Sequence, residues 1–254
     1  MSKTSWKAGT MLYPLPPVLV SCGTTEKPNV FTVAWTGIIN SQPAMTYISV
    51  RPSRYSYDLI KQSGEFVINL TTAKMLKAVD FCGVKSGKNT DKFALSGLTP
   101  ATCKKVKTPM VAESPLSLEC RVTEIKPLGS HDMFLAEIVA VNVEDEFLTA
   151  DGQFQLEKSN LIAFCHGAYY VLGGKIGTFG FSVAKKKTRK QRIAAIKQER
   201  RALKEQKQKK TASLKQKKTP PAKTKKNLSS AKSKRTAVQK SRKPRKPLNI
   251  KKAP

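Results

Sequence analysis

Two arginines and a serine stand close together, just after an apolar segment that reads as a strand. They are Arg51, Arg54 and Ser56 in "ISVRPSRYSYDLI", residues 48–60. Ser56 can cap a helix that begins at Tyr57, and the first N–H groups of a helix carry partial positive charge. A helix N-terminus, a hydroxyl and guanidinium groups together favour an anion such as a phosphate.

A second basic segment, "GVKSGKNTDKF" (83–93), could complete such a site if it faces the first. Its basic and hydroxyl side chains are Lys85, Ser86, Lys88 and Lys92. Each segment also has a plainer interpretation, which the residues alone leave open. The arginines would pair with surface carboxylates such as Asp58 or Glu65, and the second segment would be a polar loop with Asp91 capping a short helix.

The elements that must position these residues are mostly strands. Apolar, β-branched and aromatic runs predict strands at 17–22, 30–35, 45–50, 66–70, 116–125 and 133–143. The last two predict an antiparallel pair across the turn 129–132. Two short helices are expected, one from Ser56 to Gly64 and one after Thr71 or Thr72 that stops at Gly83. This order predicts a mainly β fold, with an antiparallel sheet closed into a barrel and small helices at its rim.

The positive charge of the chain is concentrated at its end. Residues 185–254 carry 29 of the 47 Lys and Arg and 2 of the 17 Asp and Glu, so their net charge is +27 and that of residues 1–184 is +3. The last aromatic residue is Phe181. We therefore divide the chain into a domain at 1–186 and a lysine-rich, low-complexity tail at 187–254, expected to be disordered or partly helical. Such a tail suits nucleic acid or another polyanion, an anionic membrane surface, or no partner at all.

Several kinds of chemistry lack support in the sequence. The five cysteines form no CxxC pair, Cys165 and His166 are too close in sequence for joint ligation, and His131 stands alone, so we expect no disulfide framework and no metal site. There is no P-loop or GxGxxG fingerprint and no nucleophile with a recognisable base, so no catalytic side chain is assigned. Without a signal peptide or an apolar run near 18 residues, we expect a cytoplasmic protein with no transmembrane segment.

Several blocks in order carry a resemblance to a known family. They include "NVFTVAWTGIINSQPAMTYISVRPSRYSYDLIKQSGEFVINL" (29–70), "DFCGVKSGKNTDKF" (80–93), "GSHDMFLAEIV" (129–139) and "YYVLGGKIGTFGFSVAKK" (169–186). The chain resembles the flavin reductase-like family, in particular its flavoredoxin-type branch, over about residues 10–186. The resemblance implies a Greek-key split β-barrel that forms a homodimer and binds FMN near the dimer interface.

The resemblance also implies which residues contact the cofactor. They are Thr32, Ala34, Trp35, Thr36, Ser49, Val50, Arg51, Arg54, Tyr55, Ser56, Lys85, Ser86 and Lys92. Residues 32–36 would lie along the isoalloxazine ring, 49–56 would follow the ribityl chain to the phosphate, and the loop at 85–86 would close over the cofactor. His131 would lie near the flavin face that a nicotinamide approaches. On a strand, Trp35 could form a flat apolar wall for the ring; its alternative is a place in the core.

The function implied is an FMN-binding oxidoreductase. It would take a hydride from NADH or NADPH and pass electrons to free flavin, a partner protein or a small acceptor. Hydride transfer needs no acid or base from the protein, because the chemistry belongs to the cofactor. Two alternatives stay open: an electron carrier that turns over nicotinamide poorly, and a nucleic-acid-associated dimer that acts through its basic tail.

Overall fold

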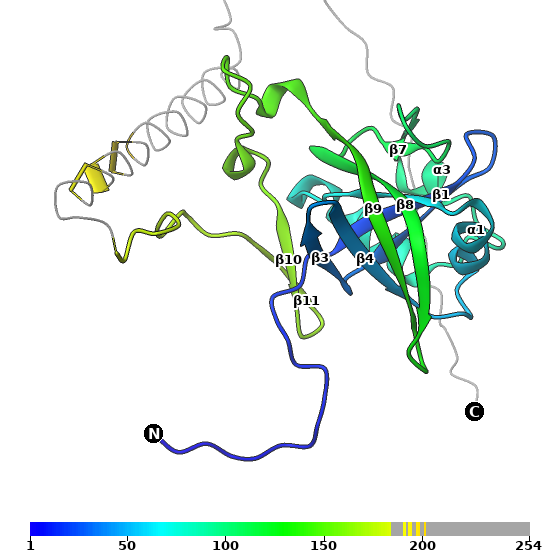
Figure 1. The fold of residues 1–254 in the computed structure, drawn as a ribbon, viewed down its shortest axis with the longest axis horizontal. Helices are drawn as coiled ribbons and strands as arrows, with labels where there is room; N and C mark the ends of the chain where they lie inside the picture. The colour runs from blue at the N-terminus through cyan, green and yellow to red at the C-terminus, as the bar shows by residue number, and fades with distance from the viewer. Residues whose placement is uncertain (184–189, 192, 195–196, 199–200, 202–254) are drawn as a thin grey trace, which may run out of the picture. The chain divides into compact units, whose positions relative to one another are not determined.

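The computed structural model describes the first 183 residues and a few beyond them. The described residues are 1–183, 190–191, 193–194, 197–198 and 201 (Figure 1). The chain divides into two compact units, Met1–Ser182 and Val183–Pro254. The described residues between 190 and 201 are helical, whereas the predicted boundary at 186 and most of the predicted tail lie outside the described residues. No helix in the described part of the chain is both long and apolar enough to cross a bilayer.

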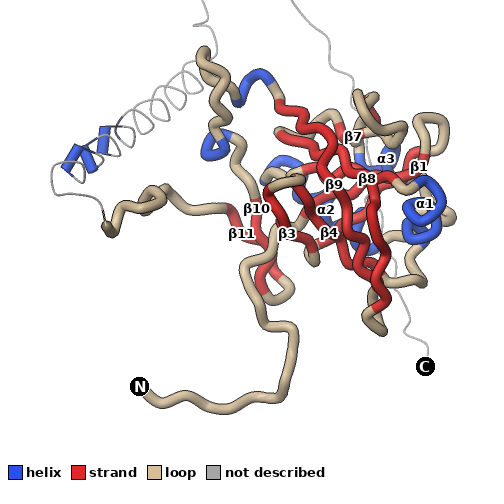
Figure 2. Tube along the Cα trace, in the orientation of Figure 1, coloured by secondary structure: helices blue, strands red, loops and turns tan. Residues whose placement is uncertain are grey.

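The first unit is built on one seven-stranded antiparallel sheet, in the order β2-β1-β5-β8-β9-β4-β3. Its strands are β1 (Val18–Gly23), β2 (Pro28–Val33), β3 (Thr36–Ser41), β4 (Ala44–Val50), β5 (Glu65–Asn69), β8 (Leu116–Pro127) and β9 (Asp132–Val143). Two small two-stranded sheets pair β6 (Pro100–Ala101) with β7 (Met110–Val111) and β10 (Ile162–Cys165) with β11 (Ala168–Val171). Strands predominate over helices, as Figure 2 shows, so the predicted mainly β class is confirmed.

The sheet closes into a barrel because its two edge strands are neighbours in sequence. In a flat sheet, β2 and β3 would lie about 29 Å apart, which is six strand spacings of about 4.8 Å. Only Ala34 and Trp35 join them, and so short a link spans about 10 Å at most. The sheet must therefore curl until its edges meet, and the amide of Ser49 on β4 donates to the Trp35 carbonyl at 2.9 Å, which extends the β3–β4 pairing into this link. Since β2 and β3 are the two edges of the hydrogen-bonded order, the barrel is split there.

Both faces of β1 are buried, which explains its uninterrupted apolar sequence. One face contributes Val18 and Val20 to the barrel interior, where Phe66, Phe134 and other apolar side chains pack. From the opposite face, Leu19 packs with the apolar side chains of the helices α2 and α3. A helix-covered face and a filled barrel interior therefore meet at this strand.

A buried carboxylate ties the loop at 104–106 to the sheet. Glu119 on β8 is fully buried, and it accepts hydrogen bonds from the backbone N–H groups of 104, 105 and 106 at 3.0, 2.6 and 3.1 Å. The Asn142 amide donates to it at 2.8 Å. Burial acts to raise the pKa of Glu119, but these hydrogen bonds outweigh it, so the pKa lies below its ordinary value.

The helices are short and lie between the strands in sequence. They are α1 (Tyr55–Ser63), α2 (Leu76–Val84) and α3 (Lys92–Ser96), with 3₁₀ turns η1 (Ala73–Met75), η2 (Asp145–Phe147) and η3 (Leu156–Lys158). The predicted C-terminal end of α1 is confirmed, and the predicted N-cap is wrong. Gly64 ends it in the left-handed region at φ 67°, but the N-cap is Arg54, and Ser56 is buried inside the first turn. Ser56 cannot cap because it already lies within the helix.

The other differences from the predicted elements concern chain segments with weak sequence signals. α2 ends at Val84 rather than Gly83, because Gly83 does not adopt the left-handed conformation that ends a helix, and the Lys85 amide still donates to the Phe81 carbonyl. The edge strand β3 was not predicted, since most of its side chains are exposed and it lacks apolar alternation. The strand predictions for β1, β2, β4, β5, β8 and β9 are confirmed within a few residues.

Candidate functional site

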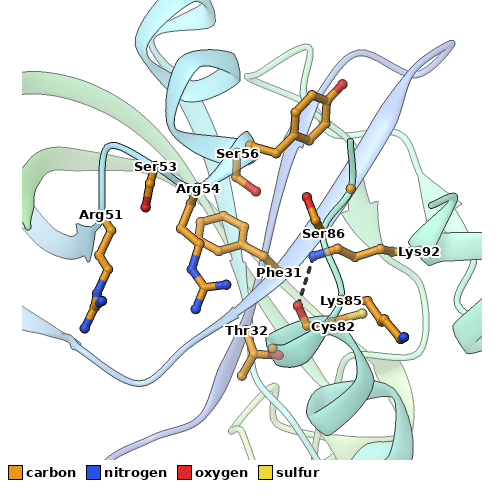
Figure 3. Close-up of a pocket in the computed structure, with 13 residues that line it drawn as sticks. Phe31, Thr32, Arg51, Ser53, Arg54, Ser56, Cys82, Lys85, Ser86 and Lys92 are labelled. Atoms are coloured by element: carbon orange, nitrogen blue, oxygen red, sulfur yellow. Dashed lines mark hydrogen bonds between the residues drawn. The ribbon is translucent and has the colours of Figure 1, made fainter. Parts of the chain in front are cut away.

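A basic cavity of about 220 Å³ lies where the start of α1, the end of α2 and the loop before α3 meet β2 (Figure 3). We call it the first cavity. It is lined by Phe31, Thr32, Arg51, Ser53, Arg54, Tyr55, Ser56, Cys82, Gly83, Lys85, Ser86, Gly87 and Lys92. Four of these described lining residues are basic and none is acidic, so the two basic segments of the sequence do face one another. The cavity therefore has the charge of an anion site.

The first turn of α1 adds polar groups to this cavity. Arg54 takes the N-cap position with extended backbone, so Tyr55 and Ser56 provide the first helical N–H groups, which have no partner within the helix. The buried Asn29 side chain donates from Nδ2 to the Ser56 hydroxyl oxygen at 2.8 Å. Because that oxygen accepts, its own proton is available to a group in the cavity.

Lys92 is the buried charge of the first cavity. Its side chain is only 4% exposed, and its Nζ donates to the Cys82 carbonyl at 2.9 Å. Burial lowers the pKa of Lys92, and Arg54 adds to the decrease, while Cys82 and Cys22 oppose it. The ammonium has two further N–H donors for a ligand, and a buried cation of this kind is costly without an anion beside it.

Gly87 brings the loop between α2 and α3, residues 85–91, close to the rest of the cavity wall. A Cβ at Gly87 would lie 2.1 Å from Oδ1 of Asn29 and 3.0 Å from a ring carbon of Tyr55. The loop could not approach so closely with any other residue at this position. Cys82 also lines the cavity, and burial raises the pKa of its thiol, so the thiol stays neutral and adds no negative charge there.

A second cavity of about 160 Å³ lies at the seam of the barrel, and its lining includes an aromatic ring and aliphatic residues. It is lined by Phe31, Thr32, Val33, Ala34, Trp35, Ser49, Val50, Arg51, Arg54 and His131. Four of these residues also line the first cavity, so the two cavities adjoin. Together they form a site with a basic end and an end lined by an aromatic ring and aliphatic side chains.

His131 and Trp35 form the rim of the second cavity. The Trp35 ring is 39% exposed, and its centroid lies 4.4 Å from that of His131 at an interplanar angle of 40°. Trp35 is in the link between β2 and β3, so the prediction that it lies on a strand is wrong, and so is the alternative of a core position. Burial, followed by the charges of Arg51 and Arg54, lowers the pKa of His131.

Nearly all of the predicted contact residues line one of the two cavities. Thr36 is the exception: it is buried, and its hydroxyl donates to the Tyr47 carbonyl at 2.6 Å. Asp91 caps α3 by accepting from the Ala94 amide at 3.0 Å, as the plainer interpretation of that segment expected. The other plain interpretation, pairing of Arg51 or Arg54 with a carboxylate, does not occur among the described residues.

Sequence reasoning missed several residues of the site. They are Asn29, Phe31, Ser53, Cys82, Gly83 and Gly87. The glycines of the 83–93 segment were a usable signal, since glycine permits close backbone approach. Asn29 lies just outside the predicted strand 30–35, whereas the structure uses its amide inside β2.

Comparison with known proteins agrees with this architecture. A family model described as "Flavin reductase like domain" matches residues 10–172. An uncharacterized protein of Archaeoglobus fulgidus is 39% identical over 136 residues, which is 54% of this chain and 76% of that protein. Flavoredoxin of Desulfovibrio vulgaris (Miyazaki F) aligns with a TM-score of 0.67 and 31% identity, over 72% of this chain and 100% of that chain. Flavoredoxin from Methanosarcina acetivorans aligns over the same shares, with a TM-score of 0.66 and 28% identity.

The family match covers most of the first unit, including both cavities, and the two flavoredoxin structures align along their whole length. The sequence resemblance to this family and to its flavoredoxin branch is therefore confirmed. The chain belongs to the flavin reductase-like family, whose fold and relatives support a flavin-linked oxidoreductase.

Proposed function

We propose that this protein binds FMN across the two cavities and uses it to accept electrons from NADH or NADPH. The observation that carries the proposal is the adjoining pair of cavities, one basic and one lined by Trp35 and Val50. A flavin mononucleotide has the same two parts, a phosphate at one end and a flat apolar ring at the other. Family membership supports the flavin, and the basic cavity supports the phosphorylated form.

The first cavity fits the phosphate. Arg54, Lys85 and Lys92 supply charge, and the start of α1 supplies backbone donors together with the Ser56 hydroxyl. Each charged hydrogen bond to a phosphate oxygen contributes about 1.5–3 kcal/mol. The buried ammonium of Lys92 supports the assignment most strongly, because no carboxylate lies among the described residues that line the cavity.

The second cavity fits the ring. Trp35, which is exposed, supplies apolar surface, and the backbone at the strand ends supplies donors for the polar edge of a flavin. When bound, FMN supplies the redox chemistry by accepting a hydride. The protein then has to orient the ring and keep one face open to the partner, and no acid or base from a side chain is needed. His131 at the rim is the candidate contact for a nicotinamide.

An electron carrier that holds FMN but oxidises NAD(P)H slowly is the second candidate, favoured by the alignment with two flavoredoxins. Steady-state oxidation of NADH and NADPH distinguishes the two. A reductase turns over in the presence of free flavin, whereas a carrier is reduced once and needs a partner protein to continue.

The proposal predicts a yellow protein that releases FMN on denaturation. Arg54→Ala should lower the affinity for FMN by about ten- to a hundredfold, corresponding to the loss of one charged contact of about 1.5–3 kcal/mol. The affinity for riboflavin, which lacks the phosphate, should fall much less. A colourless protein that cannot be reconstituted with FMN would refute the cofactor assignment, and equal weakening of both ligands would move the phosphate elsewhere.

We also propose that the protein is a homodimer. The edge strand β3 exposes Ile38 and Ile39, which are 71% and 45% accessible, close to Trp35 in sequence. If a second subunit covers the site, dilution should release flavin as the dimer dissociates. Light scattering combined with flavin fluorescence tests this, and a monomer that keeps FMN at all concentrations would contradict it.

A further inference from the structure

Arg51 is placed differently from the other basic residues of the site. It follows β4 directly and lines both cavities. Figure 3 shows its side chain on the far side of Arg54 from Ser86 and Lys92, so it stands apart from the cluster around the first cavity. Its Nε donates to Nε2 of His131 at 3.3 Å. The hydrogen bond thus joins Arg51 to the rim of the second cavity.

This contact fixes the state of His131. A guanidinium can only donate, so Nε2 of His131 must be the acceptor, and the imidazole is neutral with its proton on Nδ1. That nitrogen lies 3.0 Å from the Ser130 hydroxyl oxygen, which can accept the proton. Burial and the adjacent positive charges lower the pKa of His131, in agreement with a neutral ring. Arg51 therefore holds His131 in one tautomer, with its ring against Trp35.

The rest of the Arg51 guanidinium is available to a ligand. Nε uses one of its five N–H groups, and among the described residues no hydrogen bond or ion pair engages the two terminal nitrogens. Arg51 is exposed, and the cavity rim that it shares with His131 and Trp35 holds no carboxylate among its described lining residues. An anion that reaches this rim would meet a fixed, solvent-facing guanidinium.

We propose that Arg51 is a specificity-determining residue for the electron donor rather than a ligand of the FMN phosphate. Its terminal nitrogens bind the diphosphate of a nicotinamide dinucleotide, while the nicotinamide ring lies beside His131. The donor gives up a hydride, which is two electrons and one proton, to FMN and leaves as the oxidised nicotinamide. This inference rests on the proposed function, and the experiment below separates the failure of each.

The test compares donors with and without phosphates. NADH and NADPH carry a diphosphate, whereas 1-benzyl-1,4-dihydronicotinamide carries the same reacting ring and no phosphate. In the FMN-loaded full chain, Arg51→Gln removes the charge and keeps an N–H donor for His131. We expect kcat/KM for NADH and NADPH to fall, chiefly through KM, by about tenfold more than for the phosphate-free donor. Arg51→Lys, which keeps the charge, should recover part of that loss.

Flavin affinity is the second readout. Arg51→Gln should retain the preference for FMN over riboflavin, whereas the matched Arg54→Gln should lose it. Equal loss with both kinds of donor would mean that Arg51 acts only through the local structure, and it would overturn the inference. Loss of the FMN preference on Arg51→Gln would do the same, by assigning Arg51 to the phosphate. If the wild-type protein binds FMN but oxidises neither donor, the inference fails while the flavin assignment stands; if it binds no FMN, both fail.

Discussion

Replacing Lys92 by methionine should separate ligand binding from folding. Lys92 is 4% exposed, and among the described residues its ammonium makes one hydrogen bond, to the Cys82 carbonyl at 2.9 Å. Methionine has a similar length and no charge, so Lys92→Met removes the cation without opening a large void. If Lys92 binds the phosphate, the substitution should lower the affinity for FMN without lowering stability. If Lys92 is only structural, the substitution should lower stability instead.

Two terms decide the stability of the ligand-free protein. Losing the hydrogen bond to Cys82 costs about 1 kcal/mol. Removing a buried ammonium recovers a desolvation penalty of several kcal/mol. We therefore expect the free energy of unfolding of the variant, without FMN, to be unchanged or higher. The affinity for FMN should instead fall by about ten- to a hundredfold, which corresponds to one charged contact of about 1.5–3 kcal/mol.

Urea unfolding of the ligand-free protein and fluorescence titrations with FMN and riboflavin measure both effects. Lys88→Met is the matched control, since Lys88 is exposed, lies in the loop just before α3 and lines neither cavity. It should leave the free energy of unfolding and both affinities close to those of the wild type. A Lys92 variant that loses stability and binds FMN and riboflavin equally poorly would refute the reasoning, because Lys92 would then be a structural residue.

Three other perturbations test different parts of the structure. Gly87→Ala should weaken FMN binding, because the added Cβ would lie 2.1 Å from Oδ1 of Asn29 and push the loop away; unchanged affinity by titration would contradict this. Glu119→Gln should lower the free energy of unfolding by about 1–3 kcal/mol at pH 7, measured in urea, with the exposed Glu137→Gln as control. The pKa of Glu119 is lower in the folded than in the unfolded protein. Its ionised carboxylate therefore contributes fully to stability above the unfolded pKa, and this contribution is lost as pH falls through the folded pKa. The free energies of unfolding of the wild type and of Glu119→Gln should thus become equal in acid. Truncation after residue 186 should leave FMN binding and NAD(P)H oxidation intact but abolish binding to DNA or heparin. In the full chain, the logarithm of the DNA-binding constant should fall with the logarithm of the salt concentration, with a slope of about −0.9 per phosphate neutralised and no dependence on DNA sequence.

The sequence predicts the parts of the fold whose signal is local. The run 17–22 is apolar throughout, and the structure buries both faces of the corresponding strand β1. By contrast, β3 has turn-like residues and an exposed face, and it is a strand only because the register with β4 pairs Thr36 with Ile48. Such pairing is a property of the closed sheet and leaves no local pattern.

The candidate site shows the same division. The basic residues at 51–54 and 85–92 could be singled out by type, and the structure brings all of them except Lys88 to one cavity. The position of Ser56 in the first turn leaves no local signal, and its hydroxyl accepts a hydrogen bond from Asn29, a residue of β2 that is distant in sequence. The partner of Arg51 was equally hidden, since His131 comes from a hairpin about 80 residues further along the chain.

The two ends of the proposed site are held by different elements, and this has a consequence for function. The basic end depends on α1, α2 and the glycine-containing loop before α3. The ring end depends on strand register: the Ser49 amide is bonded to the Trp35 carbonyl, and Val50 pairs with Asp132, which places His131 beside them. A change in the loop can therefore alter cofactor affinity while the rim stays in place, and a change at the rim can alter the choice of donor while the phosphate contacts are kept. Independent control of cofactor affinity and donor choice is what paired measurements on Arg54 and Arg51 variants would detect.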